Sequence, residues 1–401
     1  MRQRLNRPAT LPLLPPLLPS GVMKRLAAKA LITSSGVVED PIITIDDGRI
    51  ARIASRNAEA ADSVDHEFAD CTLTSGFLDI HFHGIAGHDV MNASPEGLGE
   101  VARHLACAGI SRFLPTTVTA ALDDTLTALE NMATFLEASV VEGGAQAAGI
   151  HIEGPFLSHG KRGMHPAEFL LPPSPELLKR LWEASRGNIR LMTIAPELPG
   201  ALETIRYAVS VGIRCSVGHS MATRSETLAG IEAGAVSATH TFNAMRPLDH
   251  REPGILGVVL DRDDLYAELI CDGMHVAPEM VRLWLKAKGP ERAILITDCL
   301  AAAGMPDGTY KAGGTVVRIK GSACITDEGT LAGSIITLDR AVENFLQMTG
   351  ASLPVAARLA ASNPARMLGL PEELVPGAWA DFNLYGSQGE RRGTMLRGAL
   401  L

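Results

Sequence analysis

The sequence predicts an α/β protein with a (β/α)8 barrel and a small β-sandwich domain formed from both ends of the chain. Three observations lead to this prediction. Eight short apolar runs alternate with helical stretches in the middle of the chain, both flanking segments have a β pattern, and polar residues stand where the apolar runs end. Alternating strands and helices are typical of parallel βαβ units, and eight such units close a barrel.

The chain divides into three expected parts. Residues 1–22 begin with basic residues and leucines, which resembles a signal peptide, but Pro12, Pro15, Pro16 and Pro19 would break its helix. We therefore expect a disordered tail, or a start codon assigned too early with Met23 as the true start. Residues 23–72 and 374–401 are predicted to form the β domain, and residues 73–373 the barrel.

The expected elements follow from periodicity. In the β domain, alternating runs with Gly and Asp turns cover 30–40, 41–53, 66–74, 379–385 and 394–401. In the barrel, the apolar runs indicate buried parallel strands, and the stretches between them indicate helices. The strand runs are 76–83, 110–118, 147–153, 189–197, 213–219, 235–240, 265–272 and 293–298, and the helical candidates are 95–108, 122–140, 175–186, 200–211 and 278–288.

Composition limits the class of protein. The 401 residues are 46% hydrophobic and 20% charged, as in a soluble globular enzyme. A net charge of -9 without a basic block argues against a nucleic-acid partner, and no apolar run reaches the roughly 18 residues of a membrane span. None of the six cysteines stands in a CxxC pair, so we expect reduced thiols in a cytoplasmic protein.

Polar residues close the predicted strands. In a barrel, the carboxyl ends of the strands form the mouth of the active site. Side chains that end different strands should therefore meet at one face of the molecule, although they are far apart in sequence. These residues are His81, His83, Glu153, His219, His240, Asp272 and Asp298.

This set predicts a divalent-metal site. His81 and His83 are two residues apart on a strand, so both rings point to the same side, and imidazole suits zinc, iron, cobalt and manganese. The alternative for each histidine is a packed core residue. His151 shares its side of the strand with Glu153, and it is either a support for the ligands or a packing residue.

Asp298 is the predicted acid and base. A bound cation makes water acidic enough to be deprotonated at neutral pH, and one carboxylate can take this proton and then give it to the leaving group. The alternative is a helix N-cap, because LAAA follows at 300–303.

Several motifs carry a family resemblance. SGFLDIHFHG resembles the first strand of the amidohydrolase superfamily, so the expected barrel is of the amidohydrolase type. GIHIEGPF, VGHSMAT, THTFNAM, REPG, DGMHV, TDCLAAAGMPDGTY, LAGS and SNPARMLG together resemble the N-acetylglucosamine-6-phosphate deacetylases. The resemblance runs in order from about Lys24 to the C-terminus. It implies hydrolysis of N-acetylglucosamine 6-phosphate to glucosamine 6-phosphate and acetate.

The resemblance also implies roles for residues. Glu153, His219 and His240 would hold the main cation, and His81 and His83 would hold a second one in an enzyme with two, so one or two divalent cations per subunit are expected. His275 would bind the sugar and polarise the acetyl carbonyl, and Asp298 would act on the attacking water. The other implied substrate contacts are Met164, His165, Asn243, Ala244, Arg251, Asp272, Leu331, Ala332 and Gly333.

Phosphate recognition within this set is assigned to Arg251 and His165, with amide groups at Asn243 and Ala244. The family's arginine comes from a neighbouring subunit, so the resemblance implies a homodimer that shares Arg251.

Two other functions remain open at this point. The first is a different amidohydrolase, such as a deaminase or a cyclic-amide hydrolase, and the residues expected to bind phosphate argue against it. The second is an inactive barrel that serves as a binding module. Such barrels lose ligands, whereas this chain retains all six predicted groups.

Overall fold

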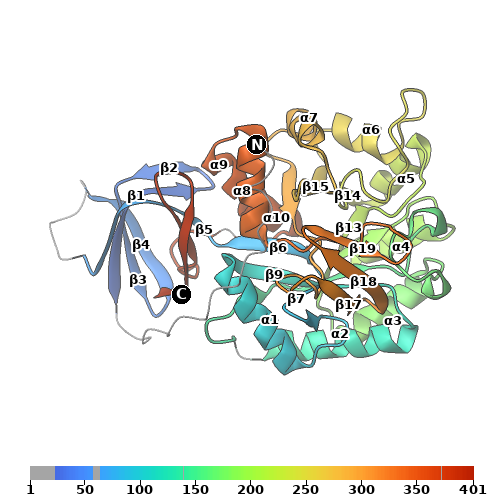
Figure 1. Ribbon diagram of the computed structural model, residues 1–401, viewed down its shortest axis with the longest axis horizontal. Helices are drawn as coiled ribbons and strands as arrows, with labels where there is room; N and C mark the ends of the chain where they lie inside the picture. The colour runs from blue at the N-terminus through green and yellow to red at the C-terminus, as the bar shows by residue number, and fades with distance from the viewer. Residues whose placement is uncertain (1–22, 57–63, 139, 372) are drawn as a thin grey trace.

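The computed structural model describes residues 23–56, 64–138, 140–371 and 373–401. Figure 1 shows a barrel with its helices on one side and a β-sheet built from both ends of the chain on the other. The tail predicted over residues 1–22 lies outside the described residues. In the part of the chain that the structure describes, no helix is both long and apolar enough to cross a bilayer.

The predicted barrel is confirmed. Eight strands pair in parallel, in sequence order, and each begins within or at the start of a run that the sequence marked. Every residue is buried in the strands over 150–153, 266–270 and 293–296, as expected for strands covered on both faces. The strands are β6 (Phe77–Phe82), β9 (Ile110–Thr117), β11 (Ile150–Glu153), β12 (Ile189–Ile194), β13 (Arg214–Val217), β14 (Ala235–Ala238), β15 (Tyr266–Ile270) and β16 (Ala293–Ile296).

The first and last strands meet through backbone and side-chain bonds. The N–H of Asp298 donates to the carbonyl of His81 (2.9 Å), and the N–H of His83 donates to that of Cys299 (2.8 Å). Beneath them, the Thr297 hydroxyl donates to the buried carboxyl of Asp79 at 2.6 Å. Burial raises the pKa of Asp79 to about 6, although the bonds from Thr297 oppose the rise. This seam fixes His81 and Asp298 relative to one another.

Helices surround the strands. Five of them lie at the positions that the sequence predicted, and three further helices follow β13, β14 and β16. The eight are α1 (Pro95–Cys107), α2 (Leu122–Glu137), α3 (Pro175–Ala184), α4 (Ala201–Ser210), α5 (Arg224–Ala233), α6 (Gly254–Asp261), α7 (Pro278–Lys288) and α8 (Leu338–Thr349).

A helical segment after α8 leads back to the terminal sheet. It consists of α9 (Leu353–Ala357), a π-helical turn (Arg358–Ser362) and α10 (Asn363–Leu368). The amide of Asn363 donates to the carbonyls of Pro290 and Ala293, at 2.8 and 2.7 Å. These bonds attach α10 to the start of β16, at the end of the barrel opposite the predicted active-site mouth.

The two ends of the chain share one sheet. The β5 strand pairs with β1 on one side and with β20 on the other, so the block of N-terminal strands and the block of C-terminal strands join into one continuous sheet. The domain boundaries at residues 72/73 and 373/374 stay a prediction. The strands of this terminal sheet are β1 (Lys24–Thr33), β2 (Gly36–Glu39), β3 (Pro41–Asp46), β4 (Arg49–Ser55), β5 (His66–Ser75), β20 (Phe382–Tyr385), β21 (Arg391–Leu396) and β22 (Ala399–Leu400).

Small strands that the sequence did not predict interrupt the barrel. An antiparallel sheet follows β16, and its contacts with Leu300, Ala332 and Met164 bury an apolar cluster of its own. Two shorter pairings involve dipeptides after β6 and before β11. These strands are β17 (Gly308–Ala312), β18 (Thr315–Lys320), β19 (Ala323–Thr326), β7 (Gly84–Ile85), β8 (His88–Asp89) and β10 (Gln146–Ala147).

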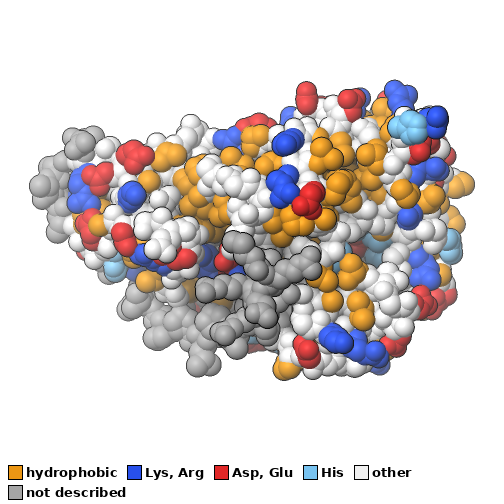
Figure 2. Space-filling model, turned by 45° about the horizontal axis from the view of Figure 1, so that its top comes forward, with side chains coloured by type: hydrophobic (Ala, Val, Ile, Leu, Met, Phe, Trp, Pro, Cys, Tyr) orange, Lys and Arg blue, Asp and Glu red, His pale blue; other side chains and the backbone are white. Residues whose placement is uncertain are grey.

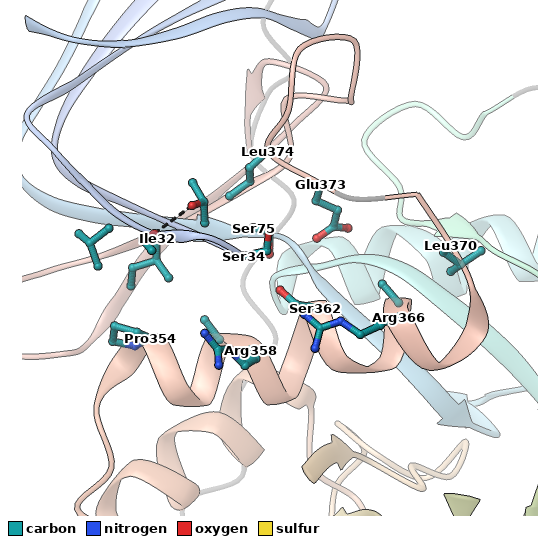
Figure 3. A pocket seen from close by; sticks show the side chains of 15 residues that line it. Ile32, Ser34, Ser75, Pro354, Arg358, Ser362, Arg366, Leu370, Glu373 and Leu374 are labelled. Carbon is teal, nitrogen blue, oxygen red and sulfur yellow. Dashed lines mark hydrogen bonds between the residues drawn. The ribbon is translucent and has the colours of Figure 1, made fainter. Parts of the chain in front are cut away.

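A cavity of about 150 Å³ lies between the terminal sheet and the helical segment after α8. In Figure 3, Arg358, Ser362 and Arg366 lie on its helical side, and Glu373 lies on the opposite side. Glu373 forms an ion pair with Arg112 of β9. Burial raises the pKa of Glu373, and Arg112 counteracts this rise. None of the predicted site residues lines this cavity.

The surface has no single-sign region on the face drawn in Figure 2. Acidic and basic side chains are interspersed there, with apolar side chains between them.

Candidate metal centre and active site

The predicted ligands meet at the mouth of the barrel. His81 is the last residue but one of β6 and His83 directly follows that strand. Glu153 ends β11, and His219, His240 and Asp298 each stand two residues beyond their strands. They form two groups, in each of which the candidate ligand atoms lie within 4.8 Å of one another. The groups are His81, His83 and Asp298, and Glu153, His219 and His240.

Glu153 belongs to the second group and also contacts the first. Its Oε1 lies 3.2 Å from Nε2 of His219 and 3.1 Å from Nε2 of His240. The same oxygen is 3.3 Å from Nε2 of His81, and Oε2 is 3.3 Å from Nε2 of His83. A carboxylate in this position can contact cations in both groups.

The histidines present the nitrogens that a cation needs. Nδ1 of His219 lies 2.8 Å from the carbonyl of Lys161, and Nδ1 of His83 lies 3.0 Å from that of Thr116. A carbonyl only accepts, so each Nδ1 carries the proton, and the neutral ring has its lone pair on Nε2. The Nε2 atoms of His219 and His240 are only 3.0 Å apart. Two nitrogen atoms at this distance can both bind one cation.

The charges of the site also fit a cation. Burial alone would raise the pKa of Asp298, but His81 and His83 lower it to about 2. Burial would likewise lower the pKa of His83, but Asp298 and Glu153 raise it to about 9. The pKa of Glu153 lies well below its usual range because His81 and His219 outweigh its burial. The buried carboxylates of Asp298 and Glu153 are thus stabilised by positive charge. Protons on the imidazoles supply this charge here, and a divalent cation can supply it instead.

Asp298 does not cap a helix. The segment after it forms turns, and over the described residues the next helix begins at Leu338. Its carboxylate Oδ1 lies 3.1 Å from Nε2 of His83, and its backbone is held by His81 and by Ser334, whose N–H donates to the Asp298 carbonyl at 2.7 Å. The helix-cap alternative is therefore wrong.

His275 is oriented by Asp272. Nδ1 of His275 lies 2.7 Å from Oδ2 of Asp272, and the backbone N–H groups of Met274 and His275 donate to Oδ1 at 2.8 Å. Burial would lower the pKa of His275, but Asp272 raises it. Asp272 is thus engaged by its own loop, and it leaves the other ring nitrogen of His275 for a ligand.

His165 lies next to Glu153. The backbone N–H of Thr119 donates to its Nδ1 (3.1 Å), so the proton of the neutral ring is on Nε2, 3.3 Å from Oε2 of Glu153. Burial lowers the pKa of His165 to about 4, which outweighs the effect of Glu153. The ring expected at the phosphate therefore donates to the central carboxylate in this structure.

His151 lies beneath the ligands. Its ring contacts that of His81 edge-on, with centroids 4.7 Å apart, and it bonds to the carbonyl of Ile80 and the hydroxyl of Thr193. Burial and the neighbouring His81 keep its pKa well below the usual range. It is a neutral, packed residue that also supports a candidate ligand.

A cavity of about 290 Å³ opens above the centre. Most predicted substrate residues line it, but three do not: Ala332 is buried, Asp272 is partly buried, and Arg251 lies on an exposed loop. The predicted residues in its lining are His83, Glu153, Met164, His165, His219, His240, Asn243, Ala244, His275, Asp298, Leu331 and Gly333.

Sequence reasoning missed part of this wall. Val118, Gly160, Lys161, Gly163 and Thr330 also line the cavity. The basic run at residues 159–162, HGKR, was a usable signal for Lys161, because a cationic side chain close to a predicted phosphate site is an obvious candidate. Val118 and Thr330 gave no chemical signal.

The chain is similar to known deacetylases over most of its length. No protein-family model matches the chain. An N-acetylgalactosamine-6-phosphate deacetylase from Escherichia coli O157:H7 is 39% identical over 345 residues, which cover 86% of this chain and 89% of that protein. An N-acetylglucosamine-6-phosphate deacetylase from Bacillus subtilis is 35% identical and covers 92% and 94%.

A solved structure gives the same result. The N-acetyl-D-glucosamine-6-phosphate deacetylase of Mycobacterium smegmatis, a D267A mutant in complex with N-acetyl-D-glucosamine 6-phosphate, has a TM-score of 0.89 and 32% identity. The match covers 95% of this chain and 99% of that one.

The barrel, with this cluster at the ends of its strands, defines a member of the amidohydrolase superfamily, a class of metal-dependent hydrolases. Within that class, the chain belongs to the N-acetylglucosamine-6-phosphate deacetylase family, and it is a hydrolase that acts on an amide bond.

Proposed function

We propose that this chain hydrolyses the acetamide of N-acetylglucosamine 6-phosphate with two divalent cations, one in each group of ligands. The observation that carries the proposal is that Glu153 belongs to one complete triad and also contacts the two histidines of the other, with all six side chains in place. The M. smegmatis relative, which shares the fold over nearly the whole chain, binds this sugar phosphate.

The residues would share the chemistry as follows. A bound cation polarises the acetyl carbonyl and makes water easier to deprotonate. Asp298 is ionised at neutral pH, so it can accept the proton of the attacking water as the new C–O bond forms. It then gives this proton to the amine nitrogen as the C–N bond breaks, which releases acetate and the free amino sugar.

Two further groups act on the acetyl oxygen and on Glu153. His275, held by Asp272, is placed to donate a hydrogen bond to the oxygen where negative charge develops. His165 donates to Glu153 and helps to hold that carboxylate where it contacts both triads. Zinc, iron, cobalt and manganese all suit these nitrogen and oxygen donors.

An acetate-release assay tests the function. Purified protein, with its metal content quantified, is expected to release acetate from N-acetylglucosamine 6-phosphate and to slow severely with unphosphorylated N-acetylglucosamine. N-acetylgalactosamine 6-phosphate belongs in the same assay, because the relative from E. coli carries the name of that substrate. Absence of acetate from both phosphorylated sugars, in protein loaded with metal, would contradict the proposal.

Phosphate recognition is proposed to involve a second subunit. Arg251 is exposed on the loop at 247–251 and does not line the cavity of its own chain. We place it in the cavity of a partner in a homodimer. Arg251→Ala should then raise KM for the phosphorylated sugar by about 10- to 100-fold, the loss expected for a charged hydrogen bond, and leave the unphosphorylated sugar unaffected.

Mixed dimers separate this arrangement from a contact within one chain. Arg251→Ala and Asp298→Asn chains, each poor alone, should regain activity when refolded or co-expressed together. In such a dimer, the site with an intact Asp298 receives Arg251 from the other chain. Activity no higher than the sum of the two parents would rule out sharing. The six free cysteines suit a cytoplasmic location for this dimer.

A further inference from the structure

Glu268 is a buried carboxylate for which the proposed reaction has no use. It stands in the middle of β15, where neighbouring residues are apolar, and its side chain is fully buried. Neither of its oxygens has a hydrogen-bond partner among the described residues. A buried carboxylate without a donor is costly, so its retention inside a barrel calls for a partner.

The nearest candidate partner is a metal ligand. Oε2 of Glu268 lies 3.7 Å from Nδ1 of His81, and this Nδ1 is also buried without a hydrogen-bond partner. The other nitrogen of the ring, Nε2, lies 3.1 Å from Nε2 of His83 and 3.6 Å from Oδ1 of Asp298. The imidazole of His81 therefore stands between Glu268 and the triad.

Two other ligands show what is missing at His81. Behind His83 the carbonyl of Thr116 accepts from Nδ1, and behind His219 the carbonyl of Lys161 does the same. Such acceptors fix the tautomer and the orientation of a ligand histidine. Glu268 occupies the corresponding place behind His81. The distance of 3.7 Å exceeds that of a hydrogen bond by less than 1 Å, which a small ring rotation can close.

We propose that Glu268 is a positioning residue whose carboxylate accepts the Nδ1–H of His81 and thereby strengthens cation binding by His81, His83 and Asp298. An anionic acceptor makes imidazole a better donor to metal than a carbonyl does, because it shares the positive charge that develops on the ring. This inference rests on the two-cation site proposed above and extends it to a residue in the interior of a strand.

Competition with a chromophoric chelator tests the inference. The full chain is loaded with Zn²⁺, and the affinity of each ion is measured for the parent and for Glu268→Gln, which keeps the shape of the side chain. We expect one of the two ions to bind about 10- to 100-fold more weakly, the range usual for loss of such a supporting carboxylate, and the other to be unchanged. Two ions bound as tightly as in the parent would overturn the inference.

Matched variants control for a general effect on the core. Ser237 is buried on the neighbouring β14 and its hydroxyl also lacks a partner, so Ser237→Ala should leave both affinities unchanged. Glu268→Asp keeps the charge but shortens the side chain, and it should weaken the same ion; it also serves if Glu268→Gln does not fold.

A double variant shows whether Glu268 acts through His81. In a His81→Asn background, Glu268→Gln should change Zn²⁺ affinity less than about twofold, because the contact is already absent. An equal loss in both backgrounds would overturn the inference. A parent chain that binds one ion would overturn it as well, and acetate release by that same preparation would still decide the proposed function separately.

Discussion

His219, His240 and Asp298 share a backbone conformation that few residues adopt. Their φ angles are +47°, +28° and +51°, and each residue stands two positions beyond the end of its strand. The left-handed region costs roughly 1 kcal/mol or more for such residues. The backbone thus turns in the same way after β13, β14 and β16, and each turn brings its side chain over the mouth of the barrel.

Replacement of Asp298 tests its role as acid and base. Asp298→Asn keeps the shape of the side chain but cannot accept a proton, so kcat should fall by about 10²- to 10⁴-fold. The cation of Glu153, His219 and His240 should remain, because Asp298 is not part of that group. Steady-state acetate release and metal quantification on the same sample measure both effects. A kcat within tenfold of the parent would refute the assignment.

Asp381 should make stability depend on pH. Burial raises its pKa to about 6, against the bond that the Arg397 N–H donates to it at 2.7 Å. The folded state therefore holds the proton more tightly than the unfolded state does. Its contribution is fully present below about pH 4, the unfolded value, and is lost as the pH rises towards 6 and above.

Asp381→Asn removes this titration. The free energy of unfolding of the variant, relative to the parent, should rise by about 2 to 3 kcal/mol between pH 4 and pH 7. Denaturant titrations of both proteins at several pH values measure the difference. A difference that does not vary with pH would show that Asp381 titrates alike in both states.

At the scale of elements, α5 depends on a reciprocal cap. The Thr223 hydroxyl accepts from the N–H of Glu226, and the Glu226 carboxylate accepts from the N–H of Thr223. Thr223→Ala should lower the free energy of unfolding by about 1 kcal/mol. The exposed Ser225, whose hydroxyl lies 3.1 Å from that of Thr223, provides the control: Ser225→Ala should change stability by less than about 0.5 kcal/mol. Equal effects in urea unfolding would argue against the cap.

The elements also show how far the sequence could be interpreted. All eight barrel strands were predictable because buried parallel strands are short, apolar and well separated. The α5 helix buries Thr227, Gly230 and Ala233, so it lacks the stripe of large apolar residues that marks a helix. In α6, GILGVVLD is apolar on nearly every side, which a short window cannot distinguish from a strand.

The residues of the site also divide into those that the sequence could predict and those that it could not. Strand ends identified the ligands, since the barrel brings them together whatever the loops do. The loops decide the rest, and their course is set by tertiary contacts that spacing does not reveal. For this reason, the position of Arg251 outside the cavity could not be predicted. The residues that support the ligands could not be predicted either: nothing in LYAELICD shows that Glu268 stands behind His81.

For the whole molecule, Arg391 joins the terminal sheet to the barrel. Its guanidinium contacts Asp339 of α8 at 2.9 Å and donates to the carbonyl of Cys107, the last residue of α1, at 2.8 Å. Arg391→Met should lower the free energy of unfolding by about 2 to 4 kcal/mol, because it leaves Oδ2 of Asp339 and the carbonyl of Cys107 without the donor that Arg391 provides.

Chemical unfolding followed by fluorescence measures this loss, and acetate release at 25 °C should stay near the parent value because Arg391 is remote from the cavity. Lys179→Met removes an exposed ion pair and is the control, with an expected change below about 1 kcal/mol. If both variants lose the same stability, the link across the sheet is unimportant.

The shared terminal sheet also sets an order of events during synthesis. Ser75 and its neighbour Asn383 are 308 residues apart in the chain, although they lie on paired strands. At about 5 to 20 residues per second, the ribosome needs roughly 15 to 60 s to deliver β20 after β5 has emerged. One edge of β5 stays unpaired for that time, so this strand is a site where nascent chains are open to chaperones and to mispairing.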